Sequence, residues 1–558
     1  MRVKISNFFN LFFSSPWFFG LGLVGLILLY VVSNVGNNIS SVSSDVWLYN
    51  FSHTQTIEGL WSEVPKNYTN EPYYLAYPIL NWAAANWQVG VARFHFLALF
   101  LLTATYLVNG LVIFAFTKKW WAATLAGLLL IIPHNVFSTQ IGMLNFNNVR
   151  GLGFAFPFYF LLSFYWIHFG LGHRVRNIVL AITAGALVYL YPLVGVIIVP
   201  LFVLTAAILK GKKYWREISL FFAIYLLVSS LFWYGHFTAG YTGMLNQESI
   251  LSPAQANLQI EILKERFHGS LFDLEFGKLK RSAWDGLPLL VLFIGSIWWI
   301  RRRSLEITPP LKNFTSISLV FSLLMVSFTV GVEIINQILS FYGQPAFFIE
   351  HIRLLRALGF VLIGQVVVGL VVLVNAGRWG QVTAFVLALL LLFSPLSLST
   401  PVVRPVVRTV VPTSIRTKYN LAPIVDQSDY KSFSNLEAAA IWSRDQLAPK
   451  AKIFVFDDSQ WEFIFKILSK HDTNLTVKEG SVWTTAGFAN SLRWYTERQN
   501  YKQKVESAGT FGEIVLFARS LEMTHMLIPR GKYEDLFKQN NFNLNTVYVN
   551  PDYRLIKL

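Results

Sequence analysis

The stretch that decides the fold is 354-LLRALGFVLIGQVVVGLVVLV-374, in which Arg356 is the only charged residue. A helix needs about 20 predominantly apolar residues to cross the roughly 30 Å hydrocarbon core of a bilayer, and this run has that length. A short polar link, 375-NAGRW-379, separates it from a second apolar run over 380–399. Two such runs in succession predict a pair of membrane-spanning helices.

The composition extends this prediction to most of the chain. Of its 558 residues, 54% are hydrophobic and only 14% are charged, whereas soluble globular proteins carry about 25% charged residues. An ordinary soluble enzyme is therefore excluded, and the chain is predicted to be a polytopic α-helical membrane protein. We expect about eleven spans, at 17–36, 93–116, 120–137, 151–170, 176–191, 193–209, 217–235, 286–300, 315–338, 354–374 and 380–399.

Two of these assignments need a separate argument. The apolar run over 176–209 is too long for one span and has Tyr191-Pro192 at its middle, so we expect a tight turn there. At the N-terminus, Arg2 and Lys4 precede the first apolar run as they would in a signal peptide. That run is long for such a peptide and no small-residue cleavage site follows it, which favours an uncleaved signal anchor.

The distribution of charge orients the spans. With the N-terminus in the cytoplasm, the inner loops are rich in basic residues, opposed only by Glu217 and Glu306, whereas the first outer loop, 37–92, is mostly acidic. This asymmetry follows the positive-inside rule. Much of the net charge of +16 is therefore topological, and nucleic acid is not an expected partner. The inner basic residues are Lys118, Lys119, Arg174, Arg176, Lys210, Lys212, Lys213, Arg216, Arg301, Arg302, Arg303, Lys312 and Arg378.

An odd number of spans places the C-terminal region on the extracytoplasmic face. We expect a membrane domain over 1–400, an extended linker over 401–430 and a small soluble α/β domain over 431–558. The long outer loops of the membrane domain lie at 37–92, 236–285 and 339–353. Within the C-terminal domain, periodicity predicts helices at 436–447, 459–470, 486–507 and 511–523, and strands at 452–456, 525–529 and 544–557.

Asp457 and Asp458 follow the first of those strands. Open α/β sheets place their ligands at such strand ends, which makes a metal or sugar site one interpretation. Acidic residues in this position also cap the next helix, and the sequence favours capping.

Asp45 is the first candidate for chemistry. It lies in 43-SSDVWLY-49, shortly after the first span on the outer side, at a depth where a carboxylate is partly desolvated. Such a carboxylate serves as a general base toward a hydroxyl or amide, or as an oxygen ligand for a divalent metal. The alternative is a solvated loop acid or the cap of a short helix, and spacing alone leaves both open.

A basic cluster, 350-EHIRLLR-356, marks the outer start of the tenth span. Arg353 and Arg356 are three residues apart and project from one face of a helix, with His351 close by. Guanidinium groups at headgroup level suit a lipid phosphate, which they bind bidentately. Alternatively, they only fix the depth of the helix or pair with the preceding glutamate. Arg150, just before the fourth span, is another outer arginine of this kind.

Three polar residues lie near the end of the ninth span at helical spacing: Glu333, Asn336 and Gln337. We expect them either to line a polar cavity that faces the interior of the bundle or to mark the wet outer end of that span. The spacing is compatible with both.

Together these features resemble the GT-C superfamily of polytopic glycosyltransferases over nearly the whole chain. The shared features are a cytoplasmic N-terminus, an odd number of spans joined partly by tight turns, Asp45 early in a long first outer loop, and an outer C-terminal domain. The resemblance implies a sugar donor on a polyprenyl phosphate or pyrophosphate and Asp45 as the catalytic base. It further implies outer basic residues that hold the phosphate, here Arg353, Arg356, His351 and Arg150.

The first outer loop departs from the family pattern in one respect. Many GT-C members carry a pair of acids, as D-x-D, E-x-D or D-D, whereas the neighbours of Asp45 are serines, Val46 and Trp47. The sequence therefore gives no metal-ligand set, and it leaves a divalent metal cofactor unassigned. The chain also contains no cysteine, which excludes thiolate metal sites and a cysteine nucleophile.

The sequence thus predicts a membrane glycosyltransferase that moves a sugar from a polyprenyl-phosphate carrier to an acceptor on the extracytoplasmic face. Its expected partners are membrane lipid and the lipid-linked donor, its expected location is a bacterial inner membrane, and the acceptor is not indicated. Two alternatives stay open. The unpaired Asp45 suits a non-catalytic protein with a GT-C-like fold, and a transporter or flippase would show internal repeats that we do not find.

Overall fold

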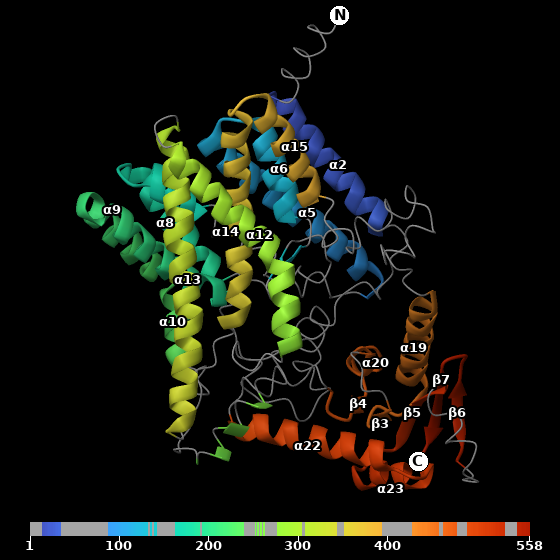
Figure 1. Cartoon of the computed structure of the whole chain (residues 1–558). Helices are drawn as coiled ribbons and strands as arrows, with labels where there is room; N and C mark the ends of the chain where they lie inside the picture. Colours follow the sequence, from blue (N-terminus) through green and yellow to red (C-terminus); the bar gives the residue numbers. More distant parts are fainter. Residues whose placement is uncertain are drawn as a thin grey trace, which may run out of the picture.

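The computed structural model describes two parts of the chain, a bundle of helices and a C-terminal α/β unit (Figure 1). The structure describes most of the helices of the membrane domain and most of the C-terminal unit. The described residues are 14–34, 87–131, 134–136, 139–141, 162–189, 192–238, parts of 252–262, 276–303, 307–342, 351–392, 427–456, 461–476, 488–530 and 544–558.

The bundle consists of helices that each overlap one or two of the predicted spans. By length and composition, three of its described stretches are sufficient to cross a membrane: Leu99–Thr117, Gly195–Val228 and Pro309–Leu339. The chain is therefore a multi-pass membrane protein, whereas the number of its spans stays a prediction. The elements are α2 (Pro16–Asn34), α5 (Trp87–Thr117), α6 (Trp120–Ile131), η4, a π-helical turn (Trp166–Gly170), α8 (Arg174–Val188), α9 (Pro192–Val228), α10 (Ser230–Thr238), α12 (Phe276–Arg302), α13 (Pro309–Phe341), α14 (His351–Val374) and α15 (Arg378–Leu392).

The third predicted span, drawn to residue 137, is too long. Helix α6 ends at Ile131, and a short antiparallel hairpin follows, β1 (His134–Val136) paired with β2 (Thr139–Ile141). Pro133 stands between them in the sequence, and proline cannot donate the hydrogen bond that would continue a helix. The hairpin packs against α12 and α14 inside the bundle.

The turn expected in the run 176–209 is present. Helix α8 ends at Val188 and α9 begins at Pro192, where proline at the first helical position loses no intrahelical hydrogen bond. Helix α9 is itself broken at Tyr214, whose φ of −125° and ψ of 25° are not helical. The chain folds back there, so that the two segments of α9 lie side by side. The Tyr225 hydroxyl of the second segment donates to the Gly195 carbonyl of the first across 2.9 Å.

Helices extend into both ends of the segment 236–285, which the sequence predicts to be the second long outer loop. Helix α10 continues to Thr238 and α12 begins at Phe276. The stretch from Phe276 to Trp284 contains Leu, Lys, Arg and Ala, which have high helix propensity, so the helix begins before the apolar run does.

The inner basic residues gather at one end of the bundle, as the charge pattern requires. Lys210 donates to Asn313 across 3.5 Å, and the Asn313 amide lies 2.8 Å from Nδ1 of His168. These contacts join the break in α9, the start of α13 and η4. The chain order then places the α5–α6 link and the start of α15 at this end too. Figure 1 shows this end facing away from the C-terminal unit, so the two ends of the bundle differ in charge and in what they contact.

Close contacts hold α12, α13 and α14 together. A Cβ atom on Gly369 of α14 would lie 2.4 Å from the Cβ of Ser296 on α12, so only glycine permits this approach. Phe202 of α9 stacks on Phe321 of α13 with ring centroids 4.0 Å apart. The side chains of these helices form one continuous apolar core.

The C-terminal unit has the elements that the sequence predicts. Its five-stranded sheet has the order β4-β3-β5-β7-β6, in which β4, β3 and β5 are parallel and β7 is antiparallel to both β5 and β6. Helix α19 begins inside the stretch expected to be a linker, whose earlier residues lie outside the described ones. The elements are α19 (Gln427–Gln446), β3 (Lys452–Val455), α20 (Trp461–Ser469), β4 (Asp472–Thr473), α22 (Phe488–Ser507), α23 (Phe511–Ser520), β5 (His525–Pro529), β6 (Thr546–Val549) and β7 (Tyr553–Lys557).

A buried histidine couples the stability of this unit to pH. Burial lowers the pKa of His525 below its usual range, and the positive charges of Lys557 and His471 lower it further. The ring is held by Thr524, whose hydroxyl oxygen lies 2.8 Å from Nδ1. The unfolded chain therefore binds this proton more readily than the folded chain does.

We expect the C-terminal unit to lose stability as the pH falls below about 6.5, the ordinary pKa of histidine. The loss is complete only below the lowered pKa of the folded state. Thermal unfolding followed by tryptophan fluorescence, at a series of pH values between about 7 and 5, measures it. His525→Gln should flatten the dependence, whereas His173→Gln, at an exposed site near the start of α8, should leave it as it is. An equal slope in wild type and His525→Gln would contradict this assignment.

Candidate functional site at the outer end of the bundle

The structure places part of the predicted site. Asp45 and Arg150 lie outside the described residues. His351 is the first residue of α14, and Arg353 and Arg356 follow within its first two turns. The two arginines therefore have the helical spacing that the sequence predicts, although their side chains are not among those described.

The start of α14 carries more positive charge than its side chains alone supply. The first N–H groups of a helix have no partner within the helix, and the helix dipole adds a partial positive charge at this end. Basic residues are usually disfavoured there, since both charges have the same sign. A helix that begins 351-HIRLLR-356 is therefore suited to an anion at its N-terminus.

Helix α13 runs antiparallel to α14 and brings a carboxylate to the same end. The Gln365 amide donates to the Thr315 hydroxyl across 3.2 Å, which fixes the register of the two helices. At 1.5 Å per residue, Glu333 lies about 27 Å from Thr315 along α13, and His351 lies about 21 Å from Gln365 along α14. Measured along the axis of the bundle, Glu333 and the start of α14 are thus within about one to two helical turns of each other.

Glu333 faces the protein rather than the lipid. Its exposed fraction is 4%, Asn336 on the next turn is half-buried, and Gln337 is exposed. The two interpretations of these residues therefore both apply, one to Glu333 and the other to Gln337. An ionisable side chain buried at this depth is costly, and such residues usually serve a function.

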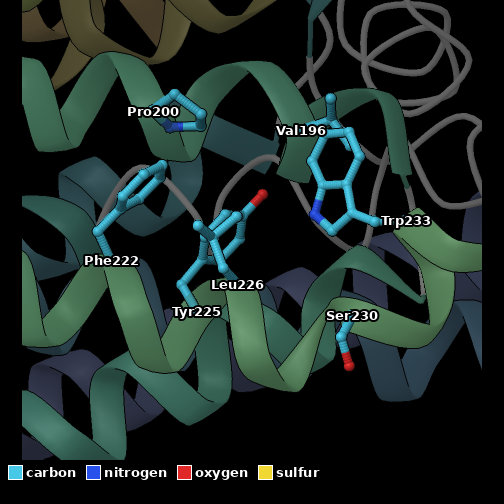
Figure 2. A pocket seen from close by; sticks show the side chains of 7 residues that line it. All are labelled: Val196, Pro200, Phe222, Tyr225, Leu226, Ser230 and Trp233. Carbon is cyan, nitrogen blue, oxygen red and sulfur yellow. The ribbon is translucent and has the colours of Figure 1, made fainter.

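An apolar groove of about 520 Å³ lies between the two segments of α9 and the start of α10. Figure 2 shows Pro200 and Val196 on one segment, facing Phe222, Tyr225 and Leu226 on the other, with the Trp233 ring at one end. Trp233 donates its indole N–H to the Ser229 hydroxyl across 3.1 Å, which fixes the ring.

The groove belongs to the outer half of the bundle. The break at Tyr214 marks the inner end of α9, and the lining residues lie toward the opposite ends of both segments. Figure 1 shows α9 at the edge of the bundle.

The C-terminal unit lies beyond this outer end (Figure 1). Strand β5 is antiparallel to β7, and β7 ends at the C-terminus on the far side of the unit. The carboxyl ends of β3 and β5 are therefore turned toward the bundle. Asp457 and Asp458, which follow β3, lie outside the described residues, so both of their interpretations stay predictions. Among the side chains that the structure describes, no three His, Asp or Glu residues are close enough to hold a metal ion.

Comparison with known proteins identifies the fold. No protein-family profile matches the sequence, and no curated protein matches it either. Among solved structures, ArnT from Cupriavidus metallidurans bound to undecaprenyl phosphate is similar, with a TM-score of 0.52 and 11% identity over 96% of this chain and 97% of that chain. The chain therefore shares its overall fold with ArnT.

A second similar structure is the archaeal oligosaccharyltransferase AglB from Archaeoglobus fulgidus, in complex with an inhibitory peptide and a dolichol-phosphate. Its TM-score is 0.49 and its identity 13%, over 93% of this chain and 70% of that chain. The fold expected from the resemblance stated above is confirmed by the similarity to ArnT alone.

Two parts of the site were not foreseen from the sequence. The proximity of Glu333 to the start of α14 depends on the register of two helices, which no local pattern records. The groove depends on the break at Tyr214, for which the only sequence signal is the basic stretch from Lys210 to Arg216 inside an apolar run.

Proposed function

We propose that this chain is a GT-C glycosyltransferase that transfers a sugar from a polyprenyl-phosphate carrier to an acceptor at the extracytoplasmic face of a bacterial inner membrane. The observation that carries the proposal is the outer start of α14, where Arg353 and Arg356 follow a positive helix terminus at about the same level along the bundle as the buried Glu333. The fold provides the framework.

The charges suit a lipid-linked phosphate. The carrier phosphate is anionic at membrane-surface depth, where two guanidinium groups and the N–H groups of a helix terminus bind it strongly. His351 extends the same set, and Arg150 contributes from the outer loop that precedes the fourth predicted span.

The reaction follows from these roles. The bond between the anomeric carbon of the sugar and the phosphate oxygen breaks, and a bond from that carbon to the acceptor atom forms. Asp45 takes the proton of the acceptor, and Arg353 and Arg356 stabilise the negative charge that develops on the departing phosphate. The proton and the charge are thereby both assigned to residues of this chain.

The lipid part of the carrier requires an apolar surface. The groove between the two segments of α9 lies at the edge of the bundle in its outer half, and its lining is almost entirely apolar. We place the isoprenoid chain there. ArnT was solved with undecaprenyl phosphate, a carrier of the class proposed here.

Lipid binding tests the phosphate site. We expect a polyprenyl phosphate or its glycosylated form to co-purify with the wild-type protein and to be lost from the double variant Arg353→Ala, Arg356→Ala, as measured by mass spectrometry of extracted lipids. Arg378→Ala is the matched control, because Arg378 is an exposed arginine at the start of α15, at the other end of the bundle. Equal amounts of carrier in all three proteins would overturn the site.

The role of the base is tested separately. Asp45→Asn should still retain the carrier but lose sugar transfer by about 10²-fold or more, the range in which general bases contribute to catalysis. The measurement is transfer of a radiolabelled sugar from the lipid donor to acceptor in membranes that contain the protein. Transfer at the wild-type rate would exclude Asp45 as the base while leaving the phosphate site standing.

Two neighbouring leucines test the groove. Leu226→Trp fills it, and we expect the co-purified carrier to decrease several-fold for steric reasons. Leu227→Trp adds the same bulk to a side chain that does not line the groove and is 72% exposed, so the carrier should be retained. Loss of carrier from both variants, or from neither, would exclude the groove as the site of the isoprenoid chain.

A further inference from the structure

Four polar side chains inside the bundle have no use in the proposed reaction. Asn109 of α5, Ser318 and Ser322 of α13 and Gln365 of α14 are each at least nine-tenths buried. Among the described residues, no hydrogen-bond partner exists for either amide atom of Asn109, for the hydroxyls of Ser318 and Ser322, or for the Gln365 carbonyl oxygen. We call these four residues the polar layer.

The polar layer lies deep in the hydrocarbon region. Ser318 and Ser322 are about 9 Å and 15 Å along α13 from Lys312, which marks its inner end. Gln365 is next to them, because its amide donates to Thr315, one turn from Ser318. The layer is therefore near mid-bilayer, where an unpaired polar group is most costly.

Asn109 belongs to the same layer. The rings of Phe116 on α5 and Phe314 on α13 have centroids 5.1 Å apart, which aligns the two antiparallel helices. Asn109 and Ser322 each lie about 10–12 Å from this contact in the same direction. Asn109 is two turns from Phe116, so both side chains are on the face of α5 that packs against the bundle interior.

The hydroxyls of Ser318 and Ser322 differ in their hydrogen bonding from those of the threonines in the same helix. Thr315 and Thr329 donate their hydroxyls to the carbonyls of Leu311 and Met325 in their own helix. Ser318 and Ser322 make no such bond in the structure. Their hydroxyls are thus available to a ligand between the helices. The threonines before and after them in α13 instead donate to carbonyls of that helix.

We propose that the polar layer is a binding site for water inside the membrane bundle. The donors and acceptors of the layer are mixed, since Asn109 presents both an N–H₂ group and a carbonyl oxygen. Water satisfies both kinds of group, whereas a cation satisfies only the acceptors and is repelled by the amide hydrogens. Buried water typically has two to four such partners.

Among the described side chains, aromatic rings border the site at one end and a methionine borders it at the other. Phe116, Phe164 and Phe314 lie on the inner side, with the Phe164 and Phe314 centroids 4.6 Å apart. Met325, which is fully buried, separates it from Thr329 and Glu333 on the outer side. The bound water joins α5, α13 and α14. This inference is independent of the proposed transferase activity.

Radiolytic labelling tests the site in the full-length protein in nanodiscs. Hydroxyl radicals formed from bound water during a short X-ray pulse oxidise side chains that they contact, and Met325 is one turn from Ser322. Met526, equally buried in the core of the C-terminal unit, is the internal control. We expect Met325 to be oxidised several-fold faster than Met526. Equal protection of the two methionines would overturn the proposal.

Variants locate the water. Asn109→Leu and, independently, Gln365→Met should each reduce the oxidation of Met325, whereas Gln381→Leu, at an exposed site on α15, should not. Two independent variants keep the test valid if one of them fails to fold. Unchanged oxidation in both would exclude the layer as the water site. An unfolding midpoint that rises when Na⁺ or K⁺ replaces choline at equal ionic strength would identify a cation and overturn the assignment to water.

Discussion

Lipid tails offer no hydrogen bonds, so polar groups in the hydrocarbon core of a bilayer depend on partners in the protein or on water bound inside it. The breaks in this bundle show how that requirement is met. After α8 ends, the Tyr189 hydroxyl donates to the Val228 carbonyl at 2.7 Å, and Tyr225 does the same for Gly195. Asn177 accepts from the Trp166 indole at 2.6 Å and donates to the Glu217 carbonyl. Tyrosine and asparagine side chains thus donate hydrogen bonds to backbone carbonyls near the ends and the break of these helices.

The order of elements was largely predictable, because each depends on local patterns. Apolar runs set the membrane helices, and alternation and periodicity set all the helices and main strands of the C-terminal unit. The prediction was wrong where hydropathy continues past a backbone constraint, as at Pro133. The position of Glu333, the α9 groove and the polar layer all depend on which helix faces pack together. The sequence pattern of a single helix does not show that packing.

The outer end of the bundle combines three environments that a lipid-linked substrate also combines. An apolar groove lies on α9, a positive helix start on α14 lies at headgroup depth, and the strand ends of the C-terminal sheet face it from the aqueous side. A tail, a phosphate and a sugar differ in polarity in the same order. The fold therefore sorts the parts of such a molecule by depth.

The basic residues at the inner end affect the rate at which the bundle could invert in the membrane. Carrying one Lys or Arg through the bilayer centre costs about 2.5–3.5 kcal/mol even on the scales that give the lowest values. Arg301, Arg302 and Arg303 alone would make inversion of the bundle very slow, and the other inner cations add to that barrier. The protein therefore keeps the orientation in which it was inserted.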